Sequence, residues 1–179
     1  MKERIEIPLS KNKIVLAIGG SILFVFLGVW LFTHSNDFQS TSLSILRNPI
    51  VIKSVGIIAI LFFGATGTYA FKKLFDKKLG LILDRNGITD NSNASSIGLI
   101  EWNDISAIKT RQVMSTQFLL IYVINPEKYI GKGNSKLKIR LMRSNMKMYG
   151  TPISITANTL KYSFVKLEQL VQSTFKKHK

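Results

Sequence analysis

The sequence of 179 residues has no cysteine and only two histidines. Without cysteine, the chain can form no disulfide and no thiolate metal site. The two histidines, His34 and His178, are far apart in the sequence, which argues against a zinc centre or histidine-based catalysis. Acidic residues are scarce as well, with 10 Asp and Glu against 25 Lys and Arg and a formal net charge of +15. We therefore expect no catalytic residues, no metal and no cofactor, and we predict that the protein is not an enzyme.

What the sequence does contain is two long apolar runs near its start. Residues 14–32 are 19 residues without a charge, and residues 50–71 are 22 residues in which Lys53 is the only charge. At about 1.5 Å of rise per residue, a helix over either run crosses a hydrocarbon core of about 30 Å. Small residues recur in both runs and let two helices approach closely, so we expect a transmembrane hairpin that packs on itself.

Basic residues flank the outer ends of the two runs. They are Lys2, Arg4, Lys11 and Lys13 before the first run, and Lys72, Lys73, Lys77 and Lys78 after the second. The connection between the runs has only Arg47 and Lys53, opposed by Asp37. Because cytoplasmic flanks collect Lys and Arg, both termini are predicted to be cytoplasmic. Two alternatives stay open: the opposite orientation, and a cleaved signal peptide, whose apolar core is normally shorter, at about 7–15 residues.

The net charge is divided unevenly along the chain. Residues 1–78 have ten basic and four acidic residues, a balance of +6, and residues 79–179 have 15 basic and six acidic residues, a balance of +9. In a soluble protein, such an excess would suggest nucleic acid as the partner. Beside a membrane, the anionic inner leaflet accounts for the excess, so we expect no nucleic acid partner.

From residue 79 on, the sequence has the pattern of strands followed by a helix. Residues 79–84 form a short apolar run, and the Asn86-Gly87 pair after it is a hairpin signal. Further strands are predicted over residues 97–102, 105–113, 118–124 and 151–156. Ser163 can cap a last helix, in which Phe164, Leu167, Val171 and Phe175 recur at spacings of three and four. This order predicts an α+β domain over residues 79–179.

Four short segments stand in order along that domain. They are GLILD at residues 80–84, GITD at 87–90, GLIEWNDI at 98–105 and YGTPISI at 149–155. The Trp-x-Asp-Ile turn at residues 102–105 is the most distinctive of them. Together with the two apolar runs, these segments resemble a family of small, mostly uncharacterised bacterial membrane proteins. In that family, two amino-terminal spans precede one pleckstrin-homology-like (PH-like) domain.

The resemblance implies a strongly bent antiparallel sheet or barrel, closed at one end by the carboxy-terminal helix. It also implies a location in the bacterial inner membrane, and it supplies no set of catalytic residues. Phosphoinositide-binding members of the wider superfamily have several basic residues in the first hairpin, where this chain has only Arg85. A specific phosphoinositide site is therefore not expected.

The strongest candidate for a binding surface is the basic segment 126–148, which we predict to be an insertion in the domain. Its seven basic residues are Lys128, Lys132, Lys136, Lys138, Arg140, Arg143 and Lys147. Apolar residues are interleaved with them at helical spacings, so the segment could lie against anionic lipids as an amphipathic piece. Alternatively, it is a solvated insertion that covers the edge of the sheet, and Gly131 and Gly133 favour this by interrupting the helical pattern. A selective headgroup site and a general electrostatic surface both stay open.

These observations lead to one functional hypothesis and one alternative. Residues 1–13 are predicted to be a cytoplasmic tail, residues 14–78 the membrane hairpin, and residues 79–179 the PH-like domain. We predict a non-catalytic interaction module that presents this domain at the cytoplasmic face of the inner membrane. Its partner would be an anionic lipid surface or an unknown protein segment. Alternatively, the chain is an accessory subunit of a membrane transporter or envelope assembly, recognised through its transmembrane helices, and oligomers are compatible with both hypotheses.

Overall fold

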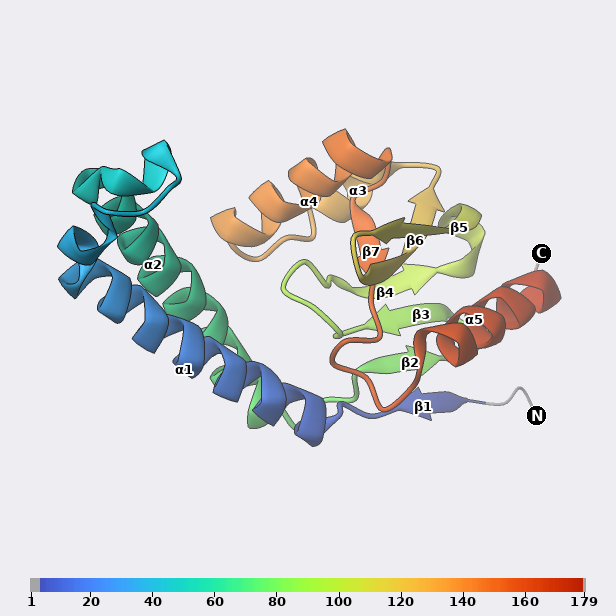
Figure 1. The fold of residues 1–179 in the computed structure, drawn as a ribbon. Helices are drawn as coiled ribbons and strands as arrows, with labels where there is room; N and C mark the ends of the chain where they lie inside the picture. Colours follow the sequence, from blue (N-terminus) through green and yellow to red (C-terminus); the bar gives the residue numbers. More distant parts are fainter. Residues whose placement is uncertain (1–3, 179) are drawn as a thin grey trace. The chain divides into compact units, whose positions relative to one another are not determined.

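The computed structural model describes residues 4–178 and divides the chain into two compact units. One unit comprises the residues up to Ser10 together with those from Lys77 onward, and the other comprises Lys11–Asp76. The chain is α+β: two long apolar helices lie in its amino-terminal half, and antiparallel sheets make up much of the rest (Figure 1).

The Lys11–Asp76 unit is a helical hairpin. Helix α1 covers Lys11–Thr33 and helix α2 covers Pro49–Leu74, with short 3-10 turns at Ser35–Phe38 (η1) and Ser44–Arg47 (η2) between them. Asn48 caps α2 by accepting a 2.9 Å hydrogen bond from the Ile50 amide. A stretch of 18 residues in α1 has a mean hydropathy of 2.5, and one in α2 has a mean hydropathy of 2.1. Only 17% and 11% of the residues in these two stretches are buried. Both helices are long and apolar enough to cross a membrane, and neither is covered as a helix in a soluble core would be.

Glycines bring α1 and α2 together. A Cβ atom on Gly56 would lie 2.6 Å from the Gly28 carbonyl oxygen, and one on Gly28 would lie 2.9 Å from the Gly56 oxygen. Phe24 and Phe63 stack with their ring centroids 4.4 Å apart. The hairpin therefore packs on itself, as expected from its small residues.

The other unit contains two antiparallel sheets. The first has the order β1 (Ile5–Ile7), β2 (Leu81–Leu83), β3 (Gly87–Asp90) and β4 (Gly98–Glu101). The second has the order β5 (Ile105–Val113), β6 (Thr116–Val123) and β7 (Ile153–Ile155). A 3-10 turn at Trp102–Asp104 (η3) leads from the first sheet to the second.

Strand β1 comes from the segment for which the sequence predicted only a tail. It pairs with β2 in the register Ile5↔Leu83 and Ile7↔Leu81, and Ile7 is fully buried. Two hydrogen bonds extend this attachment, from the Gly80 amide to the Ile7 carbonyl at 2.9 Å and from the Ser10 amide to the Thr159 carbonyl at 2.7 Å. The sheet unit is therefore made of two pieces of chain, with the whole hairpin inserted between β1 and β2.

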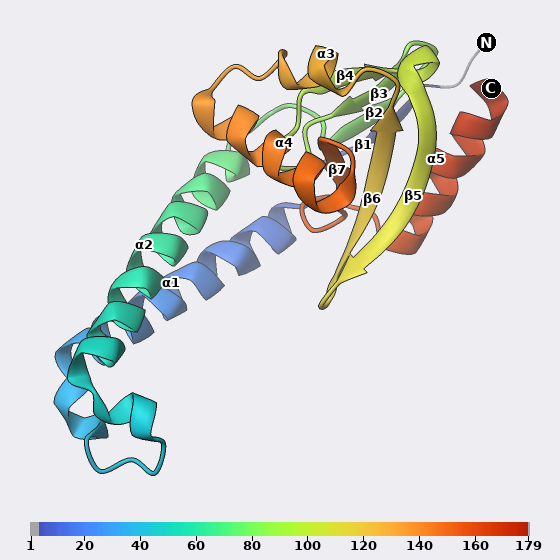
Figure 2. The same ribbon diagram turned by 90° about the horizontal axis from the view of Figure 1, so that it is seen from above.

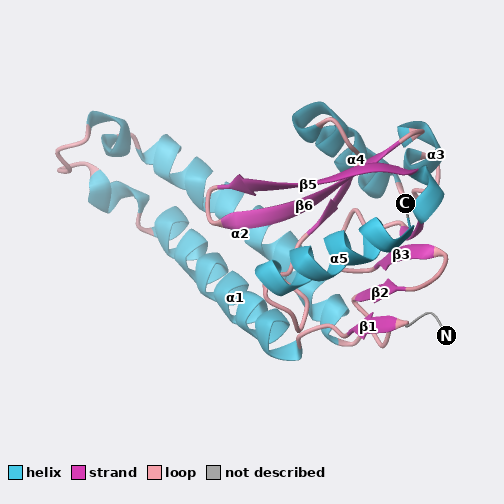
Figure 3. Cartoon of the chain, turned by 90° about the vertical axis from the view of Figure 1, so that its right-hand side faces the viewer, coloured by secondary structure: helices cyan, strands magenta, loops and turns pink. Residues whose placement is uncertain are grey.

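The expected barrel is not closed. The two strand ladders stay separate, because η3 turns the chain between β4 and β5 and the β5 register shifts between Ile105 and Ala107. Helix α5 (Phe164–His178) lies between the two sheets in Figure 3. Its buried Leu167 and Val171 belong to one core cluster with residues of both sheets.

Two further helices, α3 (Pro126–Ile130) and α4 (Lys136–Tyr149), lie between β6 and β7 in the sequence. Figure 2 shows α4 and α5 on opposite sides of the β5–β6 hairpin. Helix α4 contacts β7 and α3. The basic segment is therefore a pair of helices on the side of the second sheet away from α5.

Candidate functional site

Helix α4 has well-formed ends, which explains where it begins and stops. The Ser135 hydroxyl accepts a 3.2 Å hydrogen bond from the Lys138 amide at the first turn. Gly150 ends the helix in the left-handed conformation, with φ of 75° and its amide bonded to the Met146 carbonyl. Gly131 and Gly133 lie in the connection from α3, so they precede α4 and do not interrupt it.

One face of α4 is fixed to the domain. Met142 is fully buried, and Ile139 packs against the same core. The Asn145 amide donates to the Pro152 carbonyl at 3.3 Å and to the Ser154 hydroxyl at 3.2 Å. These contacts fix the rotation of the helix and therefore decide which side chains face outward.

The first outward face is basic, and we call it the cationic stripe. It consists of Lys136, Arg140, Arg143 and Lys147, all exposed. At about 100° per residue, these positions fall within an arc of roughly 60° along the length of the helix. Only Arg143 has an ion-pair partner, Glu127 at 3.3 Å. Within the described part of the chain, the other three cations of the stripe have no hydrogen-bond or ion-pair partner.

A second outward face, beside the first, is apolar, and we call it the apolar stripe. It consists of Leu137, which is 66% exposed, Met148, which is 52% exposed, and the half-buried Leu141. These three positions fall within an arc of roughly 40°, whose centre is about a third of a turn from the centre of the cationic stripe. Helix α4 therefore has three faces: buried, cationic and exposed apolar.

The remaining three predicted basic residues are held by the domain itself. Lys128 contacts Asp104 at 2.7 Å and Glu101 at 3.1 Å. Lys132 donates to the Leu99 carbonyl at 3.3 Å. Lys138 donates to the Ser96 carbonyl at 2.6 Å. The structure thus brings together four of the seven predicted residues and assigns the other three to contacts within the domain.

Lys128 belongs to a cluster with Glu101, Asp104 and Tyr129, which we call the η3 clamp. The fully buried Tyr129 donates its hydroxyl hydrogen to Asp104 at 2.6 Å, and the same hydroxyl accepts from the Glu101 amide at 3.2 Å.

The hydrogen bonds from Lys128 and Tyr129 lower the pKa of Asp104. Burial, and then the hydrogen bond to Asp104, raise the pKa of Tyr129 to about 12. The bonds to Asp104 and Glu101 raise the pKa of Lys128. The clamp joins η3 to α3, with Lys128 bonded to both carboxylates and Tyr129 bonded to Asp104.

Two further carboxylates of the sheet unit, Asp84 and Asp90, serve local structure. Asp84 accepts from the Asn86 amide at 2.8 Å in the β2–β3 turn. Asp90 accepts from the Ser92 amide at 2.8 Å and from the Ser96 hydroxyl at 2.5 Å. Both carboxylates satisfy donors of their own turns, as is usual for Asp at strand ends.

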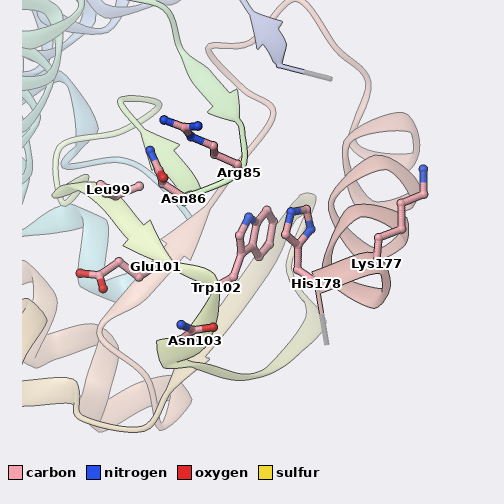
Figure 4. A pocket seen from close by; sticks show the side chains of 8 residues that line it. All are labelled: Arg85, Asn86, Leu99, Glu101, Trp102, Asn103, Lys177 and His178. Carbon is pink, nitrogen blue, oxygen red and sulfur yellow. The ribbon is translucent and has the colours of Figure 1, made fainter. Parts of the chain in front are cut away.

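A polar pocket that the sequence did not indicate lies at the other end of η3. Its volume is about 570 Å³, and its lining includes Arg85, Glu101, Trp102, Lys177 and His178. Figure 4 shows the Trp102 and His178 rings side by side, with ring centroids 4.9 Å apart. Two cations against one carboxylate give this pocket a weaker positive character than the cationic stripe. Because its lining comes from the β2–β3 turn, β4, η3 and the end of α5, no local pattern could have revealed it.

Comparison of the chain with protein-family models, with curated proteins and with solved structures finds no match.

Proposed function

We propose that the protein is a membrane-anchored, non-catalytic interaction module that binds an anionic lipid surface or an anionic protein segment. The cationic stripe of α4 is its binding surface. The observation that carries this proposal is the division of the basic segment. Three cations serve the domain, whereas Lys136, Arg140 and Lys147 point outward on one helix face without a partner among the described residues. These three outward-pointing cations are therefore available to a partner outside the chain.

The pairing of β1 with β2 supports an anchor of two spans. The strand before α1 and the strand after α2 belong to one sheet, so both ends of the hairpin must lie on the same side of the membrane. A cleaved signal peptide would remove β1, whose Ile7 is part of the core. The basic flanks support a cytoplasmic location for that side, and we propose the bacterial inner membrane as the site of the anchor.

We also infer that the sheet unit is a PH-like domain. A four-stranded and a three-stranded antiparallel sheet, with a carboxy-terminal helix between them, support this inference. The domain would then comprise β1 as well as the residues after the hairpin. The proposal of a binding module does not depend on this assignment, because fold alone does not specify function.

The proposal is tested by measuring how closely the domain approaches a bilayer. Because the chain has no cysteine, Ser144→Cys gives one labelling site on α4 for energy transfer to acceptor lipids in nanodiscs. We expect more transfer in discs with anionic lipid than in neutral discs, and a loss of the difference at high salt. The triple substitution Lys136→Gln, Arg140→Gln and Lys147→Gln should abolish the difference.

The matched control removes three cations from elsewhere in the same unit. Lys161→Gln, Lys166→Gln and Lys176→Gln change the net charge equally at exposed positions outside α4. This variant should retain the response to anionic lipid. If both triple variants behave alike, or if wild-type protein ignores the lipid charge and binds no acidic peptide, the cationic stripe is not a binding surface.

A second candidate function is that of an accessory subunit recognised through the hairpin. A groove of about 340 Å³ between α1 and α2 favours it, with Gly64 in its lining. A Cβ atom on Gly64 would meet nothing within 4 Å, so this glycine is not needed for packing within the hairpin. Replacing both helices by unrelated spans separates the two functions, since an interaction module would tolerate the exchange and a subunit would not.

A further inference from the structure

We propose that α4 lies flat in the headgroup region of an anionic bilayer, with its apolar stripe inserted between the lipids. This inference rests on the proposed function and names the occupant of the same surface. Binding through the cationic stripe alone would not explain why the apolar stripe is exposed, whereas insertion between the lipids gives the apolar stripe a role.

Two of the three residues of the apolar stripe are largely uncovered in the described structure. Leu137 and Met148 are 66% and 52% exposed, whereas the helix is attached to the domain through Met142 on its buried face. The outer surface of α4 thus pairs a cationic strip with an apolar strip. Helices that lie in a membrane interface have this composition, because the apolar side chains enter the acyl boundary while the cations meet the headgroups.

The geometry favours a planar surface over an acidic protein segment. The cationic stripe begins at Lys136 and ends at Lys147, and the apolar stripe begins at Leu137 and ends at Met148. Both therefore run side by side along almost the whole helix, which is about 21 Å long at 1.5 Å per residue. A flat anionic surface satisfies both stripes over that length at once. Moreover, the chain has two helices of the length and hydropathy of membrane spans.

The experiment measures the depth of single residues in the bilayer. Leu137→Cys and Met148→Cys, each labelled with an environment-sensitive fluorophore, report from the two ends of the apolar stripe. Val165→Cys on α5, which is an apolar position 56% exposed, is the matched control. The full-length protein is placed in nanodiscs of phosphatidylcholine with or without phosphatidylglycerol, and brominated lipids serve as quenchers.

We expect a blue shift and quenching at positions 137 and 148 in the anionic discs, and neither at position 165. Bromines on the acyl chains close to the headgroups should quench more than bromines close to the chain ends, because the helix lies at the interface. A second pair of variants, Leu137→Gln and Met148→Gln, should weaken the approach of a label at position 144 while leaving its salt dependence.

Three results would overturn the insertion. If the label at position 144 approaches anionic discs but positions 137 and 148 are not quenched, the proposed function stands and the insertion is wrong. If position 144 shows no approach to lipid and an acidic peptide instead covers the stripe, the occupant is a protein, and the assignment of the bilayer as the occupant is wrong. If neither lipid nor peptide is bound, both the inference and the proposed function fail.

Discussion

The most informative perturbation is at Ile7, because it tests whether the residues before the hairpin belong to the domain. Ile7 is fully buried in the core beside Leu81. Ile7→Ala removes three buried carbons, worth about 2.4 kcal/mol at about 0.8 kcal/mol per methylene. The cavity left behind raises the expected loss to about 2–5 kcal/mol. A tail that took no part in the fold would tolerate the same change.

The assay is urea unfolding of the full-length chain in detergent micelles, followed by Trp102 fluorescence. Trp102 is buried in the domain, and Trp30→Phe removes the other tryptophan, which lies in α1. At an m-value of about 2 kcal/mol per molar urea, Ile7→Ala should lower the midpoint by roughly 1–2.5 M.

The control for this experiment is Glu6→Ala in the same strand. Glu6 forms an exposed ion pair with Arg4, and loss of such a pair should cost no more than about 1 kcal/mol. Equal midpoints for the Ile7 and Glu6 variants would refute the role of β1. So would a fragment of residues 79–179 that unfolds at the same midpoint as the domain in the full chain.

Three further predictions concern the clamp, the hairpin and α4. The pKa of Tyr129 is raised from 10.0 to about 12, so the stability that its hydroxyl adds is complete below pH 10 and lost as the pH rises towards 12. Urea titrations of the wild type should therefore lose stability more steeply over that range than those of Tyr129→Phe. Gly56→Ala should force α1 and α2 apart and speed hydrogen exchange of α2 amides in micelles, whereas Gly64→Ala, which meets no atom within 4 Å, should change nothing. Met142→Ala should cost about 2–5 kcal/mol in the same urea assay, and Leu137→Ala, at an exposed position, no more than about 0.5 kcal/mol.

The hairpin could be predicted from the sequence because its signal is local and long. Each apolar run is long enough to specify a helix, and the observed helices extend past the runs, to Lys11 at one end and Leu74 at the other. Strand β1 could not be predicted in this way. It has only three residues, Ile5–Ile7, and its partner strand lies beyond the whole hairpin. Its place in the sheet depends on a long-range pairing that no window of sequence contains.

We predicted the candidate site from the sequence as one segment but did not indicate which of its side chains share a helix face. The basic segment, residues 126–148, was identified by charge alone, and its division was missed. Spacings of four, three and four between Lys136, Arg140, Arg143 and Lys147 would have indicated one helix face. Nothing local could assign Lys138 to a carbonyl oxygen 42 residues away, at Ser96. Composition identifies a charged segment, and only the fold decides which of its charges are free to bind.

The tether to the hairpin explains why a weak surface would be sufficient. A short linker gives a domain an effective concentration of about 1 mM at its target, so an intrinsic affinity near −4 kcal/mol already gives half occupancy. On an anionic surface, Lys136, Arg140 and Lys147 would contribute about 3 kcal/mol. Partial burial of Leu137 and Met148 would add about 1–2 kcal/mol. The sum lies close to the affinity needed for half occupancy, so the bound and unbound states of the domain would be similarly populated. Removal of the three cations would then shift the binding equilibrium by roughly 100-fold. A surface this close to half occupancy would respond to lipid charge and salt without a selective headgroup site.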